Sequence, residues 1–171
     1  AAQMCIRDSL HTLASHMHRL AMQGLSDTTK SSTPTDFALM NHVVHMILQV
    51  APTAGVLAFV PPLLALAQET SAPVVSNAAL VHHTLTCRWF VGAVFAQISN
   101  VWQQQSILDY LHVHHEPTLR DMAPTAPDLS DSYDPSPLEI PHFGSGLYSE
   151  APAYAWDTPF LIEALSSNLA L

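Results

Sequence analysis

Charged residues are scarce in this sequence. Asp, Glu, Lys and Arg make up only 11% of its 171 residues, against about 25% in ordinary soluble proteins. Only five of these residues are Lys or Arg. Since binding to phosphates depends on clustered cations, we expect no nucleic-acid groove.

Cysteine and glycine are also rare. Two cysteines with unrelated surroundings predict neither a disulfide framework nor a thiolate metal site, and they are typical of a reducing, intracellular compartment. No Gly-rich phosphate loop or dinucleotide fingerprint occurs among the five glycines. We therefore expect no cofactor.

One long stretch of the sequence is almost free of charged residues. Between Phe37 and Leu108 the only charged side chains are Glu69 and Arg88, and all of the excess negative charge follows Leu108. Such a stretch must pack against protein or lie in lipid. Val50–Ala67 has nearly the length of a membrane span but contains three prolines. We therefore expect burial in a soluble protein assembly, with a membrane protein as the alternative.

The sequence predicts a mainly α fold, a helical bundle around one long central helix at about 76–115. Apolar residues recur there at spacings of three and four, which places them on one broad face of a helix. Ser76 or Asn77 is expected to cap its start, and Pro117 prevents its continuation. Gly92 is the expected position of a kink or a break.

Shorter helices are predicted on both sides of this stretch. One covers about 10–23, a second begins after Thr35 and ends at Pro52, and a last one covers 158–171 and could be truncated. Two further short helices are expected to meet at a bend at Pro61 and Pro62, since adjacent prolines disturb an α-helix. Residues 10–115 would thus form a helical core.

The two remaining segments differ in character from the core. Residues 4–9 read MCIRDS, which one reading frame of a transposon end used in sequencing libraries would encode; we therefore interpret 1–9 as an artefact and the chain as a possible fragment. Residues 116–157 are rich in proline and acid and show no sustained period, which predicts an extended arm. Its aromatic residues suggest that the arm packs against a neighbouring subunit or its own helices.

Histidine is the residue type most able to carry chemistry here. Eleven occur, and seven of them form three groups that are candidate metal ligands: His42 and His45; His82 and His83; and His112, His114 and His115. In having three clusters on apolar helices, the chain resembles the membrane-bound desaturases and hydroxylases, which bind two irons through several histidine boxes. The spacings depart from that family's pattern in each cluster, so we expect polar-face or hydrogen-bonded histidines.

The predicted function is therefore non-enzymatic. We expect a structural protein that forms a homo-oligomer or binds other subunits, with aromatic side chains as interface anchors: Trp89, Phe95, Trp102, Tyr148, Tyr154 and Trp156. In its long helices and proline-rich arm it resembles in style the helix-rich capsid (coat) subunits of double-stranded RNA viruses. The alternative is an integral membrane protein with a histidine-bound metal, similar to the hydroxylases and desaturases.

Overall fold

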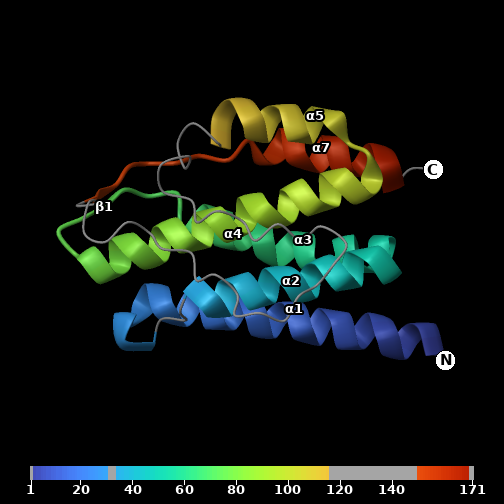
Figure 1. Cartoon of the computed structure of the whole chain (residues 1–171), viewed down its shortest axis with the longest axis horizontal. Helices are drawn as coiled ribbons and strands as arrows, with labels where there is room; N and C mark the ends of the chain where they lie inside the picture. The colour runs from blue at the N-terminus through green and yellow to red at the C-terminus, as the bar shows by residue number, and fades with distance from the viewer. Residues whose placement is uncertain (1, 31–33, 116–149, 170–171) are drawn as a thin grey trace.

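Consecutive helices run in opposite directions and form a bundle (Figure 1). The computed structural model describes residues 2–30, 34–115 and 150–169. The four main helices are α1 (Ala2–Ser26), α2 (Pro34–Val50), α3 (Pro52–Glu69) and α4 (Ala78–Trp102), and a short 3-10 turn, η1 (Thr28–Lys30), follows α1. The predicted mainly α fold is confirmed.

The core lies between the four main helices. α1 packs mainly against α3, α2 packs mainly against α4, and α3 also contacts α4 and α2. Side chains with no exposed surface fill the interior: Phe37, Val44, Leu48, Val91, Val94, Phe95 and Ile98. The chain thus buries much of its uncharged stretch within itself.

Two prolines lie inside α3, and the predicted division into two helices at this point is wrong. The helix is continuous from Pro52 to Glu69 and includes Pro61 and Pro62. A proline leaves the carbonyl four residues earlier without its helical partner. Pro61 frees the carbonyl of Leu57, and both residues lie on the exposed side of α3, where water can bind that carbonyl. Pro62 likewise frees the carbonyl of Ala58, which is only 2% exposed.

The predicted helix at 76–115 is helical along most of its length but changes direction once. Asn77 caps α4 by accepting a hydrogen bond from the backbone N–H of Leu80 at 3.1 Å. Gly92 causes no break; α4 ends instead at Trp102, and the next residue, Gln103, has a left-handed φ of 53°. The chain then runs back along the bundle as α5 (Gln105–Tyr110) and the π-helical turn η2 (Leu111–His115) (Figure 1).

The C-terminal segment returns to the same bundle. Strand β2 (Glu150–Ala151) pairs antiparallel with β1 (Val74–Val75) ahead of α4. The backbone N–H of Tyr154 then donates to the carbonyl of Ser71 at 2.9 Å. The last helix, α7 (Thr158–Leu169), lies beside α5 (Figure 1). Asp157 caps it by accepting the backbone N–H of Phe160 at 3.1 Å.

The structure describes only the last part of the predicted arm at 116–157. Its last part, 150–157, packs on the chain's own helices, while 116–149 lies outside the described residues. Within the described ranges, no helix combines the length and the apolar character needed to cross a membrane.

Candidate functional site

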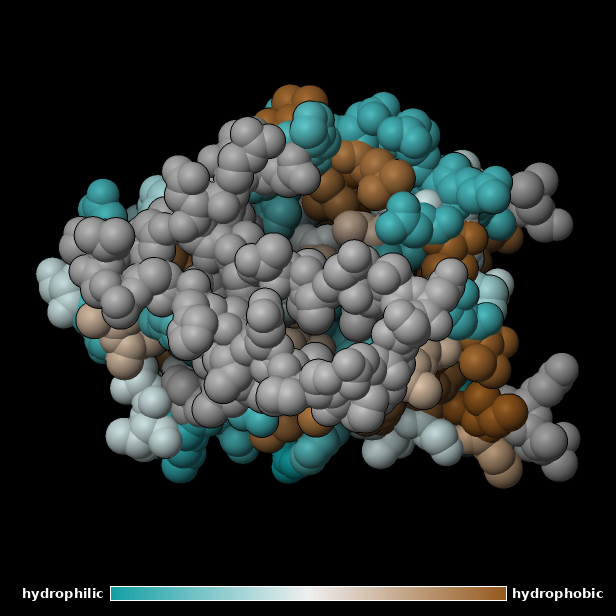
Figure 2. All heavy atoms as spheres, in the orientation of Figure 1, coloured by the Kyte–Doolittle hydropathy of each residue, from teal (hydrophilic) through white to brown (hydrophobic). Residues whose placement is uncertain are grey.

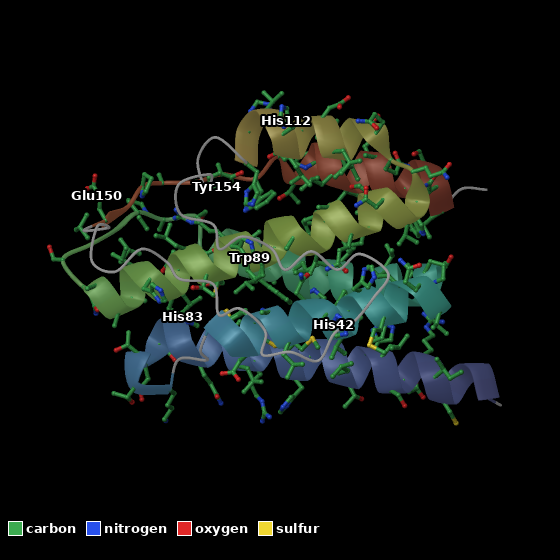
Figure 3. The ribbon with its side chains drawn as sticks, in the orientation of Figure 1. His42, His83, Trp89, His112, Glu150 and Tyr154 are labelled. Atoms are coloured by element: carbon green, nitrogen blue, oxygen red, sulfur yellow. The ribbon has the colours of Figure 1, made fainter. Side chains whose placement is uncertain are left out.

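The candidate histidines lie in three separate parts of the bundle (Figure 3). His42 and His45 are half-buried on α2, and His82 is half-buried at the start of α4 beside buried His83. In η2, His112 and His114 are exposed and His115 is buried. Over residues 2–30, 34–115 and 150–169, no three His, Cys, Asp or Glu side chains lie close enough to hold a metal ion.

His83 joins α4 to α1. Its ring is 2% exposed, and its Nε2 lies 2.8 Å from the carbonyl oxygen of Ala21. The ring fits against Gly24 so closely that a Cβ there would lie 2.3 Å from it. Burial lowers the pKa of His83, although the Ala21 hydrogen bond opposes this effect. The neutral ring is therefore a packing element between the helices.

Cys87 and His83 resemble a nucleophile and its base, but their surroundings oppose that role. The Cys87 sulfur lies 3.5 Å from Nε2 of His83. Cys87 is 0% exposed, so a substrate cannot reach it. Burial also raises the pKa of the Cys87 thiol well above its usual value. A thiol must become a thiolate to attack, so this pair lacks both access and activation.

His115 occupies a second close-fitting position, against α4. An added Cβ on Gly92 would lie 1.9 Å from its Nε2, so only glycine admits the ring. Its Nδ1 lies 3.0 Å from the Tyr154 hydroxyl, and its ring lies 4.7 Å from that of Trp156. Burial lowers the pKa of His115 to about 4. His115 is therefore neutral at physiological pH and fixes η2 on α4.

Arg88 is the most deeply buried charge among the described residues. It is 0% exposed, and it donates to three backbone carbonyls: from Nε to Thr70 at 2.8 Å, from Nη1 to Pro152 at 2.6 Å, and from Nη2 to Ala72 at 3.1 Å. The guanidinium also lies 5.8 Å from the centre of the Tyr154 ring.

This arrangement makes Arg88 a structural tie. It joins the middle of α4 to the α3–α4 connection and to the C-terminal segment. Within the part of the chain that the structure describes, no carboxylate forms an ion pair with it. Burial lowers the pKa of Arg88, but a guanidinium stays protonated at neutral pH. The sequence already indicates a special role for Arg88, since it is the single Lys or Arg between Phe37 and Leu108.

Most predicted interface anchors are covered by the chain itself. Trp89, Phe95, Tyr154 and Trp156 are at most 9% exposed, so their surface serves the intramolecular core. Trp102 is half-buried, and Tyr148 lies outside the described residues. The four buried aromatic side chains therefore offer a partner almost no surface.

A small hollow lies between α1, α2, α3 and α4. Its free volume is about 20 Å³, and its lining is almost entirely apolar, including Met17, Val44, Phe59 and Phe90. A single water needs roughly 10–15 Å³ by this measure, whereas ligand pockets measure about 300–1,000 Å³. This hollow is a packing imperfection and does not have the size of a substrate site.

No protein-family model matches this chain, and comparisons with curated proteins and with solved structures found no match. Function must therefore be argued from the residues themselves.

Proposed function

We propose that the chain is a non-enzymatic assembly protein that associates with copies of itself through the outer face of α2 and α3. The supporting observation is that residues 37–68, which form nearly all of both helices, contain no Asp, Glu, Lys or Arg. The solvent-facing sides of surface helices ordinarily carry charged and polar residues. An uncharged outer face on two helices is typical of a surface that another protein covers.

Exposure within the single chain supports this reading. Large apolar side chains on this face have high exposed fractions: Leu39 52%, Met46 56%, Val50 87% and Leu57 41%. Figure 2 shows hydrophobic side chains, among hydrophilic ones, at the end of the bundle where α1 begins and α2 ends. Single exposed apolar residues are common on proteins, but three of these four lie on one helix, α2, and a row of exposed apolar residues is a feature of interaction surfaces.

The chemistry of the other candidate residues favours binding over catalysis. The Cys87 thiol and the His83 and His115 rings are buried and held in their uncharged forms. All three guanidinium nitrogens of Arg88 donate hydrogen bonds to backbone carbonyls of the chain itself. These groups stabilise the fold, whereas the outer faces of the described helices are exposed and can bind another molecule. A helical shell subunit, the class that the sequence resembles in style, is one assembly that such a module could build.

Light scattering coupled to size exclusion tests the proposal. The purified chain is measured without detergent from about 1 to about 100 µM. We expect a mass above the 18.6 kDa of one chain, increasing with concentration. A mass of one chain at every concentration, with full helical content, would contradict self-assembly.

A further inference from the structure

Helix α2 is apolar on two opposite faces. Its core face carries Phe37, Val44 and Leu48, each 0% exposed. At about 100° per residue, a second set of apolar residues lies on the far side within an arc of about 60°. This set, the outer stripe, consists of Leu39, Val43, Met46 and Val50. A helix that is apolar on both sides is normally buried on both sides.

The spacing of the outer stripe identifies a helix as the fitting partner. The steps are four, three and four residues, the alternation that forms a seam between paired helices. The exposed members are Leu39, Met46 and Val50, whereas Val43 packs partly on the chain's own core. α2 has 17 residues and is therefore about 25 Å long, which gives the stripe three turns of contact.

We infer that the outer stripe pairs with the same stripe of a second copy, in antiparallel orientation about a two-fold axis. This inference rests on the proposed function and names its contact surface. Charge favours a second copy. The chain has a net charge of −9, yet 37–68 carries none of it, so two copies can meet there without apposed like charges. A two-fold contact uses the same patch on both chains. The spacing of the stripe is the same in both directions, so the stripe can pair with itself.

The antiparallel orientation follows from electrostatics. Parallel pairing would place the Asp36 carboxylates of the two copies at the same end, side by side with aligned helix dipoles. Antiparallel pairing separates the two Asp36 residues by about 25 Å, which exceeds the screening length of about 8 Å at physiological salt. It also pairs opposite ends of the helix dipoles.

The antiparallel geometry predicts which residues meet. The stripe is centred between Val43 and Met46, so these two residues face each other across the axis. Leu39 of one copy then lies opposite Val50 of the other. On a single helix these two positions are eleven residues, or about 17 Å, apart, so they cannot pair within one chain.

A charge-pair experiment tests this register. Four variants of the whole chain are compared by sedimentation equilibrium: Leu39→Glu, Val50→Lys, Leu39→Glu with Val50→Lys, and Leu39→Glu with Val50→Glu. Ile162→Glu, at a site on α7 that is 48% exposed, is the matched control. Circular dichroism checks that each variant keeps its helical content. Because all three positions are exposed, the fold should tolerate the charges.

We expect each single stripe variant to weaken association at least about ten-fold, because a charge is buried against an apolar residue. The Glu–Lys double variant should recover most of that loss, whereas the Glu–Glu double variant should not. Ile162→Glu should leave the dissociation constant unchanged. Equal association of the two double variants, with the unmodified chain still oligomeric, overturns the antiparallel pairing alone. An unmodified chain that stays monomeric overturns the proposed function as well.

Discussion

Acidification should destabilise the fold through His115. Burial places the pKa of this ring at about 4 in the folded chain, against a usual value of 6.5 in the unfolded chain. The unfolded state therefore binds a proton first as the pH falls. The stability that the neutral ring contributes is complete above about pH 6.5 and is lost as the pH falls toward about 4. A shift of about 2.5 pH units corresponds to about 3 kcal/mol, of which about 2 kcal/mol is lost by about pH 5.

Urea denaturation, followed by circular dichroism at about pH 7.5 and about pH 5, measures this loss. His83 also has a lowered pKa and contributes in the same direction, so the effect of His115 is isolated with His115→Phe. Phenylalanine keeps a ring of similar shape above Gly92 but cannot titrate. The unmodified chain should lose about 2 kcal/mol more than His115→Phe between the two pH values.

The matched control for this experiment is His11→Phe, because His11 is exposed on α1. This variant should show the same pH dependence as the unmodified chain. If His115→Phe loses as much stability on acidification as the unmodified chain, protonation of the buried His115 ring is not the cause of the loss.

Three further predictions concern the fold. Arg88→Lys should cost at least about 2 kcal/mol of unfolding free energy, because the donors of an ammonium sit on one nitrogen and cannot reach three carbonyls that three separate guanidinium nitrogens bind. Arg19→Lys, at an exposed position, should cost almost nothing, and equal urea midpoints for the Arg88→Lys variant and the unmodified chain would contradict the role of Arg88 as a structural tie. Gly92→Ala should destabilise the chain by at least about 1 kcal/mol, because its Cβ would overlap the His115 ring. Adding His115→Ala should remove most of that specific clash, and strictly additive losses in a double-mutant cycle would exclude it. Deleting 1–9 should change stability by no more than about 0.5 kcal/mol, since residues 5–9 are exposed; a large drop in melting temperature would show that this segment belongs to the fold.

Periodicity and end signals predicted most of the helices. Apolar spacing marked α1, α2 and α4, Asn77 marked the start of α4, and Pro52 marked the end of α2, because local hydrogen bonding and sterics determine those positions. The continuity of α3 was not predictable from the same rules. Whether adjacent prolines break a helix depends on where the freed carbonyl points, and that depends on tertiary packing. The left-handed turn at Gln103 is likewise a tertiary effect at a residue without a strong local preference.

The roles of the buried residues were harder to predict. Sequence spacing grouped His83 with His82 and His115 with His114, but the structure separates each pair into a buried and a less buried ring. The partners that decide this, such as Ala21 for His83, are distant along the chain. The outer stripe of α2 cannot be recognised from the sequence alone, because its apolar residues alternate along the helix with those of the core face. Only the exposed fractions separate the two faces.

Methionine oxidation provides the most direct test of the claim that another copy covers α2. In the single chain Met46 is 56% exposed, whereas Met17 and Met40 are 7% and 8% exposed. Hydrogen peroxide oxidises accessible methionine to the sulfoxide, which mass spectrometry locates on each peptide. At about 100 µM chain, we expect Met46 to oxidise nearly as slowly as Met17 and Met40, and its oxidation to become faster on dilution. Rapid oxidation of Met46 at every concentration, with the two core methionines still protected, would contradict it.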